Sequence, residues 1–278
     1  MILDLSSCTS NDLSQSGELV TSQEGGSQPF DGIIEVLKQR LASLPDSHVI
    51  RQIIAHSPMM LKKIYLAFGE LVFKSVPEFI MVEMVRKLAK PDSIIIEVGA
   101  LTGASTEKFA SFVGKGLVVA IEPNPLCISL LARRVKKLQN VRILNVAAGS
   151  RRGTGTLYVS GARGRGSSLI QQNAWNQSAV MIMTIDEIIN ILRLPKVDLI
   201  IIDVEGSEVD VLMGCLSALE LCRYFIVEVH HFVSLTNEKE VNLILSSHGF
   251  QMVERRIDSV SPLITVDLYA KVYQDCKP

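Results

Sequence analysis

Apolar residues follow two different periods along the chain, and the change between them divides the sequence. From Asp31 to about Lys90 they recur every three or four residues, which is typical of amphipathic helices. After Pro91 the pattern changes to short β-branched runs separated by amphipathic segments. Strands that are apolar on both faces and alternate with helices predict a mostly parallel sheet with helices on either side.

Seven apolar runs are predicted as the strands of this sheet. They read SIIIEV, GLVVAIE, VRILNVAA, VDLIIIDV, YFIVEVHH, FQMVERRI and LITVDLYAKV. A short turn-like DSVSP separates the last two, so these should form an antiparallel hairpin. Helices are predicted up to about Val113, over 124–138 with Asn124 as the cap and Pro125 in the first turn, and near 185–192, 208–219 and 237–247.

The same patterns give three segments. Residues 1–29 are rich in Ser, Gln, Gly and Thr without a hydrophobic period, which predicts disorder. Residues 30–77 are predicted as a helical extension that caps the active site, supports a homo-oligomer, or does both. Residues 78–278 are predicted as one α/β domain.

Net charge, apolar runs and cysteine spacing indicate which partners and which cellular compartment to expect. The net charge is −1, which gives no reason to expect nucleic acid or an anionic membrane as the main partner. No run approaches 18 uninterrupted apolar residues, so we expect no membrane span. The five cysteines form no CxxC pair, which indicates free thiols in a reducing compartment and a cytoplasmic location.

The first strand ends in EVGALTGAST, a glycine turn that opens a helix. A dinucleotide-binding loop needs glycine where Leu101 stands, and Glu97 adds a negative charge that opposes a pyrophosphate. A cationic ligand without phosphate, such as S-adenosylmethionine, fits both features. Its carboxylate could use backbone N–H groups near Gly103, its amino group could face Glu97, and Glu122 at the end of the second strand could meet its ribose.

A second group of polar residues follows the strands VDLIIIDV and YFIVEVHH. Asp203 ends an otherwise apolar strand, and a charge there is expensive unless it opens onto a cleft. Glu228 and His230 alternate on the next strand and point to one face. His230 is predicted as a general base, with His231 aimed at the opposite face. Alternatively, Asp203, Glu228 and His230 bind a divalent metal ion, although no metal is expected from the spacing alone. The neighbouring Glu208 and Asp210 are interpreted as acids that favour a helix N-terminus.

Several motifs in order resemble the FkbM-type S-adenosylmethionine-dependent methyltransferases over residues 78–272. EVGALTGAST is similar to the family's DVGANxGxxT, AIEPNP to its FEPNP, and IIIDVEGSEVDVLMGC to its KIDVEGxExxVLxGA. NVAAGS, GSSL, TIDEI and FIVEVH also stand in the expected places. Leu101 replaces the family's Asn and Ile202 a common Lys, so any cofactor contact from those side chains is in doubt.

The resemblance implies a Rossmann-like class I methyltransferase fold and methyl transfer to a hydroxyl of a sugar or another small metabolite. The catalytic residues would be His230, Asp203 and Glu205. The residues implied for S-adenosylmethionine binding are Glu97, Gly99, Ala100, Gly103, Thr106, Glu122, Pro123, Ala148 and Asp203.

Two other functions stay open from the sequence. One is an NAD(P)-dependent oxidoreductase, which Leu101, Glu97 and the terminal hairpin oppose. The other is a non-catalytic Rossmann-like module that binds RNA through the interval RRGTGTLYVSGARGRGSSL. Arginines 151, 152, 163 and 165 in this interval form either a lid over an anionic acceptor or a solvated loop, and Trp175 either walls the acceptor pocket or packs the lid.

Overall fold

The computed structural model describes residues 76–159, 166–170, 174, 176–231, 237–257 and 264–272. The predicted disordered segment, most of the predicted helical extension with its role in oligomerisation, Arg163, Arg165 and Trp175 lie outside these residues. Within the described ranges, no helix combines the length and the apolar character needed to cross a bilayer.

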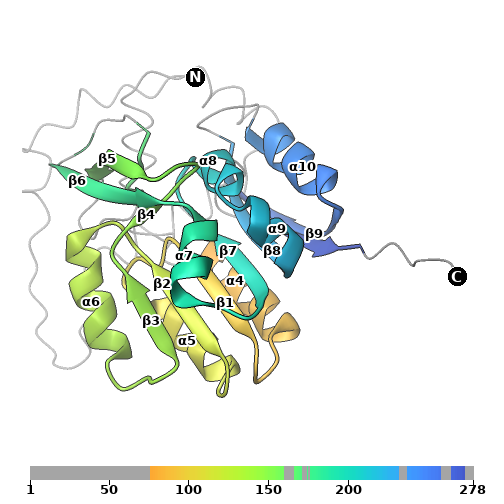
Figure 1. Ribbon diagram of the computed structural model, residues 1–278, viewed down its shortest axis with the longest axis horizontal. Coiled ribbons are helices and arrows are strands. Elements are labelled where there is room, and N and C mark those ends of the chain that lie inside the picture. The colour runs from red at the N-terminus through yellow and green to blue at the C-terminus, as the bar shows by residue number, and fades with distance from the viewer. Residues whose placement is uncertain are drawn as a thin grey trace, which may run out of the picture. The chain divides into compact units, whose positions relative to one another are not determined.

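A seven-stranded sheet forms the centre of the fold, with the order β3-β2-β1-β7-β8-β10-β9 (Figure 1). The first five strands in this order are parallel, whereas β10 is antiparallel to both β8 and β9. This confirms the predicted mostly parallel sheet with a C-terminal antiparallel hairpin. The strands are β1 (Ile94–Val98), β2 (Leu117–Ile121), β3 (Val141–Leu144), β7 (Val197–Ile202), β8 (Cys222–His230), β9 (Phe250–Ile257) and β10 (Ile264–Lys271).

The strands are apolar on both sides because each face of the sheet is covered by helices. Along β1, Ile95 belongs to one apolar cluster while Ile96 and Val98 belong to the other. Burying an isoleucine side chain contributes about 1.5–3 kcal/mol, so this alternation favours one register and two separate cores.

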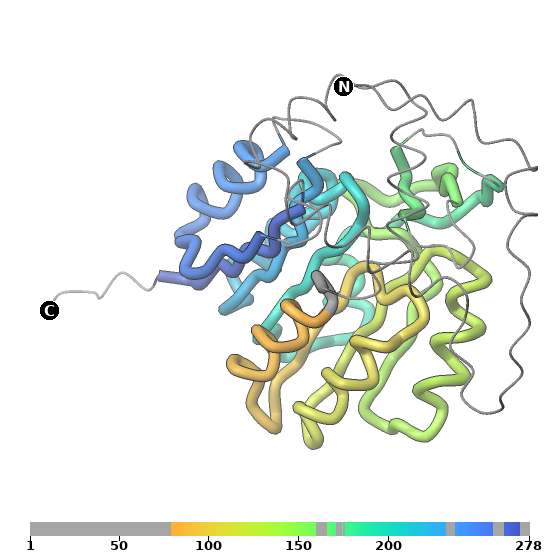
Figure 2. Tube along the Cα trace, turned by 180° about the vertical axis from the view of Figure 1, so that it is seen from behind, coloured from red at the N-terminus to blue at the C-terminus, as the bar shows by residue number. Residues whose placement is uncertain are grey.

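Helices α4 (Val76–Leu88), α5 (Ala104–Phe112) and α6 (Pro125–Val135) supply side chains to one of these cores. In Figure 2 they lie in front of the sheet. The other core takes side chains from α7 (Ile185–Leu192), α8 (Glu208–Met213), α9 (Leu216–Leu221) and α10 (Asn237–Ser247). The predicted start of α6 is confirmed, because the Asn124 side chain accepts a hydrogen bond from the Leu126 N–H and Pro125 is the first helical residue.

The predicted helix over 208–219 is two helices instead of one. The break falls at Gly214, where an added Cβ would lie 2.1 Å from the backbone oxygen of Gly149. The Asp186 carboxylate accepts hydrogen bonds from the N–H groups of Ser217 and Ala218, at 2.8 and 2.9 Å. The Asp186 carboxylate thus caps the N-terminus of α9 as a separate helix, and nothing in the local sequence indicates this long-range contact.

A second, three-stranded sheet has the order β4-β6-β5 and takes its strand β5 from the Gly/Arg-rich interval. Its strand β4 comes from the run VRILNVAA, which was predicted as one strand but is divided between β3 and β4 in different sheets. The sheet contains β4 (Ala147–Ala148), β5 (Gly153–Val159) and β6 (Asn176–Met183). Strand β6 pairs antiparallel with β5 and parallel with β4. Strand β6 was not predicted from the sequence, because its pairing spans a long connection and its first residues are polar.

Helix α7 begins with a capping box that gives a direct stability test. The Thr184 hydroxyl accepts a hydrogen bond from the Glu187 N–H at 3.0 Å, and the Glu187 carboxylate accepts one from the Thr184 N–H at 3.1 Å. We expect Thr184→Ala to lower the free energy of unfolding by about 1 kcal/mol. Thr184→Ser keeps the acceptor oxygen, so denaturant unfolding should show a much smaller loss; equal losses in the two variants would rule out the cap.

Candidate functional site

The strand order reverses beside β1, since the chain continues from β1 through β2 to β3 on one side and returns to β7 on the other. At such a switch point the loops after neighbouring strands diverge and leave a crevice. A cavity of about 270 Å³ lies there, lined by residues at the carboxyl ends of β1, β2, β7 and β8 and in the loops that follow the first three of these strands.

The glycine turn after β1 brings three backbone segments into contact. The N–H groups of Gly99 and Ala100 both donate to the backbone oxygen of Ile121, at 2.9 and 3.1 Å. Gly99 has a φ of +94°, and a Cβ there would lie 1.8 Å from the backbone oxygen of Asp203. Glycine is therefore required by the packing of the turn itself. Leu101 also has a positive φ, 48°, which costs about 1–3 kcal/mol unless neighbouring contacts hold it.

Glu122 supplies one of those contacts. Its carboxylate oxygens accept hydrogen bonds from the N–H groups of Leu101 and Asn124, each at 2.8 Å. The side chain is only 5% exposed and lines the cavity, so it is not a solvated strand end. Burial raises the pKa of the Glu122 carboxyl, while the two N–H donors partly offset that rise.

Glu97 is buried at the end of β1 and also lines the cavity. Its carboxylate accepts hydrogen bonds from the hydroxyls of Ser105 and of Thr106, the latter at 2.6 Å. Thr106 is fully buried behind Glu97, so it orients the carboxylate rather than facing the cavity. Gly103 packs against Leu131, where a Cβ would lie 2.4 Å from the Leu131 side chain.

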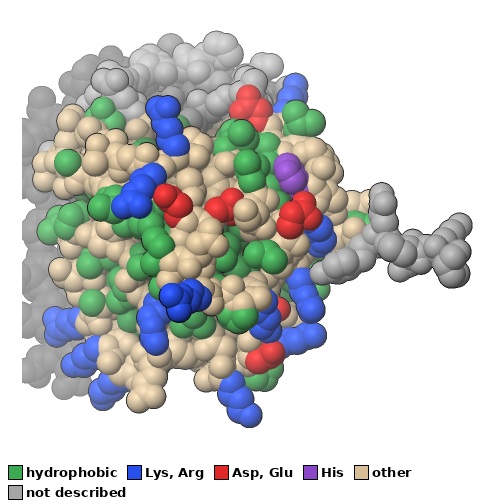
Figure 3. Space-filling model, viewed as in Figure 1, with side chains coloured by type: hydrophobic (Ala, Val, Ile, Leu, Met, Phe, Trp, Pro, Cys, Tyr) green, Lys and Arg blue, Asp and Glu red, His purple; other side chains and the backbone are tan. Residues whose placement is uncertain are grey.

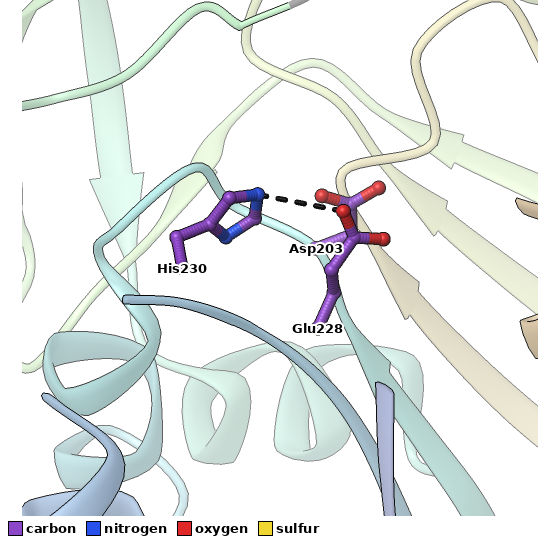
Figure 4. A group of neighbouring side chains, drawn as sticks. All are labelled: Asp203, Glu228 and His230. Atoms are coloured by element: carbon purple, nitrogen blue, oxygen red, sulfur yellow. Dashed lines mark ion pairs between the residues drawn. The ribbon is translucent and has the colours of Figure 1, made fainter. Parts of the chain in front are cut away.

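A second acidic group lies where β7 and β8 end (Figure 4). Asp203, Glu228 and His230 place potential ligand atoms within 4.8 Å of one another. The His230 Nε2 is 3.4 Å from a Glu228 oxygen and 3.2 Å from a Glu205 oxygen. This confirms the predicted common face of Glu228 and His230 and their proximity to Asp203.

Glu208 also belongs to this group, although this was not predicted from the sequence. It is fully buried, and its Oε1 lies 2.7 Å from the His230 Nδ1. The same oxygen accepts the Gly206 N–H at 2.9 Å, and the other oxygen accepts the Asn237 side-chain amide at 2.6 Å. Glu208 therefore fixes His230 instead of merely favouring the start of α8. The last glutamate of the VEGSE motif was the available signal.

The surroundings of His230, the predicted general base, raise its pKa. Burial alone would lower its pKa, but Glu205, Glu208 and Glu228 together raise the pKa of His230 well above its ordinary value. Burial raises the pKa of the Glu228 carboxyl, and His230 opposes that rise. The three carboxylates therefore favour the protonated form of this fully buried imidazole, which is a hydrogen-bond donor at both ring nitrogens.

The structure thus brings most of the predicted site residues to one cavity. Gly103, Thr106 and His230 are not among the described residues that line it. Lining residues outside the predicted site include Leu101, Thr102, Leu157, Leu169 and Glu228. The predicted residues that line the cavity are Glu97, Gly99, Ala100, Glu122, Pro123, Ala148, Asp203 and Glu205.

Comparison with known proteins places this geometry in a family. Residues 97–252 match the model of the methyltransferase FkbM domain. The chain is 24% identical over 162 residues to the 2-O-methyltransferase NoeI of Sinorhizobium fredii, covering 52% of this chain and 67% of NoeI. It is 27% identical over 169 residues to the hexuronic acid methyltransferase AglP of Haloferax volcanii, covering 60% of this chain and 66% of AglP.

The crystal structure of methyltransferase FkbM from Methylobacillus flagellatus aligns with a TM-score of 0.48 and 17% identity, over 87% of this chain and 58% of that one. The chain spans about two thirds of the length of the two curated relatives, 67% of NoeI and 66% of AglP. Because the family model matches more than half of the sequence, and its match contains both acidic groups of the cavity, the chain belongs to the FkbM methyltransferase family.

Proposed function

We propose that this protein transfers the methyl group of S-adenosylmethionine to a hydroxyl of a sugar or another small metabolite. The observation that carries the proposal is the lining of the switch-point cavity by buried carboxylates, Glu97 and Glu122, where a dinucleotide-binding fold presents a phosphate cradle. A ligand with an ammonium, a sulfonium and ribose hydroxyls complements such a lining.

Each end of the cofactor has a proposed partner. Glu97, oriented by Thr106, faces the ammonium group, and Glu122 accepts hydrogen bonds from the ribose hydroxyls. Ala148, with Pro123, lines the side proposed for adenine. The backbone from Ala100 to Thr102 borders the methionine carboxylate.

Methyl transfer to oxygen then requires positioning and a proton acceptor. The hydroxyl oxygen donates an electron pair to the methyl carbon, the carbon–sulfur bond breaks with its electrons going to sulfur, and the hydroxyl proton goes to a base. We propose Glu205 as that base, because it lines the cavity with its side chain 26% exposed, whereas His230 is buried behind it. In this arrangement His230 positions the Glu205 carboxylate, and Asp203 faces the sulfonium end of the cofactor.

The names of the two relatives support a sugar hydroxyl as the acceptor, since one is a 2-O-methyltransferase and the other a hexuronic acid methyltransferase. RNA is less favoured. On the face shown in Figure 3, the Lys and Arg side chains of the described residues lie scattered among acidic and uncharged ones and do not merge into one basic surface.

Calorimetric titration with S-adenosylmethionine, S-adenosylhomocysteine and NAD⁺ tests the proposal. We expect the two sulfur compounds to bind and NAD⁺ not to bind. Glu97→Gln should weaken S-adenosylmethionine binding by about tenfold, because a hydrogen bond to a charged group is lost, whereas Glu240→Gln on the exposed surface of α10 should not. Binding of NAD⁺, or of RNA with a steep salt dependence and no methyl transfer, would contradict the proposal.

A further inference from the structure

Three side chains of types that bind metal ions converge where β7 and β8 end. Ile202 pairs with Val227, so the next residues, Asp203 and Glu228, continue side by side, and His230 follows on the same face of β8. Their potential ligand atoms lie within 4.8 Å of one another (Figure 4). The register of two parallel strands therefore brings the three groups together.

Glu228 gives an independent indication that a ligand binds here. Its side chain lines the cavity although the residue is only 5% exposed. Among the described residues, no donor reaches its buried Oε2 within hydrogen-bond distance. A desolvated carboxylate oxygen without a donor is costly, and a cation in the cavity wall would satisfy it.

The orientation of His230 suits a metal ligand. Its Nδ1 lies 2.7 Å from the Glu208 carboxylate, which the Asn237 side chain holds in turn at 2.6 Å. Nε2 faces the other carboxylates, 3.2 Å from a Glu205 oxygen and 3.4 Å from the nearer Glu228 oxygen, and it lies beside Asp203 (Figure 4). A carboxylate on one imidazole nitrogen commonly fixes the other nitrogen for a metal ion.

We propose that Asp203, Glu228 and His230 bind one divalent metal ion, best matched by Mn²⁺, in the wall of the cavity. Carboxylates favour Mg²⁺, Ca²⁺ and Mn²⁺, while imidazole favours transition metals, and Mn²⁺ suits the mixed set. Metal binding releases the Nε2 proton. The sequence alone favoured no metal, because the strand register and the support from Glu208 are not visible in the spacing.

Three protein ligands leave coordination positions open toward the cavity. An acceptor hydroxyl bound there would be oriented and acidified, so that Glu205 could take its proton more readily. This role rests on the proposed methyl transfer, whereas the ion site itself does not.

Manganese binding to the full chain tests the site without substrate. After removal of bound metals with EDTA, the protein is titrated with MnCl₂ and free Mn²⁺ is counted by electron paramagnetic resonance. We expect one Mn²⁺ per chain, with pulsed spectra that show coupling to a histidine nitrogen. Asp203→Asn and Glu228→Gln keep side-chain size and should each weaken binding at least about tenfold, and Glu208→Gln, which acts through His230, by about 10- to 100-fold.

His231→Ala is the matched control, because this neighbouring histidine contacts Thr265 and Glu238 instead of the cluster. It should bind Mn²⁺ like the wild type. Circular dichroism shows whether each variant is folded. If either Asp203→Asn or Glu228→Gln unfolds, the Mn²⁺ affinity of the other variant tests the site. A folded wild type that binds no stoichiometric Mn²⁺, a bound ion without nitrogen coupling, or unchanged binding in both ligand variants overturns the proposal.

Titration of the same metal-free protein with S-adenosylmethionine separates this site from the proposed function. If S-adenosylmethionine binds but Mn²⁺ does not, the ion site fails alone. If Mn²⁺ binds and S-adenosylmethionine does not, even after Mn²⁺ is added, the ion site stands and the proposed function fails.

Discussion

Gly99→Ala is expected to lower the free energy of unfolding by about 3–5 kcal/mol, because it combines a strained positive φ with overpacking. The new Cβ would lie 1.8 Å from the backbone oxygen of Asp203. That oxygen cannot retreat easily, since the Asp203 N–H donates to the backbone oxygen of Val98 at 2.9 Å. Scanning calorimetry should show a melting temperature lower by roughly 10 °C, and the folded fraction should lose S-adenosylmethionine binding.

Two other glycines separate general destabilisation from damage to the site. At Gly114 an added Cβ meets no atom within 4 Å, so Gly114→Ala should melt like the wild type. At Gly116 it would lie 1.9 Å from the backbone oxygen of Ser93, beyond the opposite end of β1. Gly116→Ala should therefore lose stability but keep its affinity for S-adenosylmethionine when folded. If Gly99→Ala keeps both stability and binding, the close packing of the turn against β7 is wrong.

Features with local signals could be predicted from the sequence. The strands are recognised by apolar runs because both of their faces are buried, and the Asn124–Pro125 start of α6 needs only adjacent residues. The acidic residues at strand ends, Glu97, Glu122 and Asp203, were also identified, because a charge after an apolar run must open onto a cavity or find donors.

Features that depend on distant pairing could not be predicted in this way. Strand β6 exists because it pairs with β5, and the break between α8 and α9 depends on Asp186 and Gly149. His230 was predicted as a base from its ordinary pKa, yet its state depends on carboxylates that the fold brings around it. One of them, Glu208, is 22 residues away in the sequence.

Glu122→Gln is expected to weaken S-adenosylmethionine binding by about 10- to 100-fold, because hydrogen bonds from the ribose to a charged acceptor are worth about 1.5–3 kcal/mol each. In the wild type, the N–H groups of Leu101 and Asn124 each donate to a Glu122 oxygen at 2.8 Å. In the variant, the amide NH₂ of the glutamine would face one of these two N–H donors. Calorimetry on this variant, with Glu240→Gln as the exposed control, measures the loss. Equal affinities for Glu122→Gln and the wild type would remove Glu122 from the cofactor site.

The pH dependence of binding gives Glu122 a second signature. Burial raises the pKa of its carboxyl above the ordinary 4.5, so the group begins to take up a proton at a pH above that value. Protonation removes the charged acceptor, and affinity should therefore fall as the pH is lowered through the raised pKa. The effect on stability has the opposite sign. The folded state holds this proton more tightly than the unfolded state, because the pKa of Glu122 is higher in the folded protein. The contribution of Glu122 to the free energy of unfolding therefore decreases as the pH rises from the pKa of the unfolded state to that of the folded state.

Titrations from about pH 8 to about pH 5 on the wild type and on Glu122→Gln isolate this group, because the window lies above the ordinary carboxyl pKa. Glu228 and His230 also have raised pKa values and affect both proteins alike. The difference between the two affinity curves should therefore shrink toward acid, as the wild-type carboxyl becomes neutral like the glutamine amide. Curves that stay parallel over the whole range would mean that the ionised Glu122 carboxylate does not hold the cofactor.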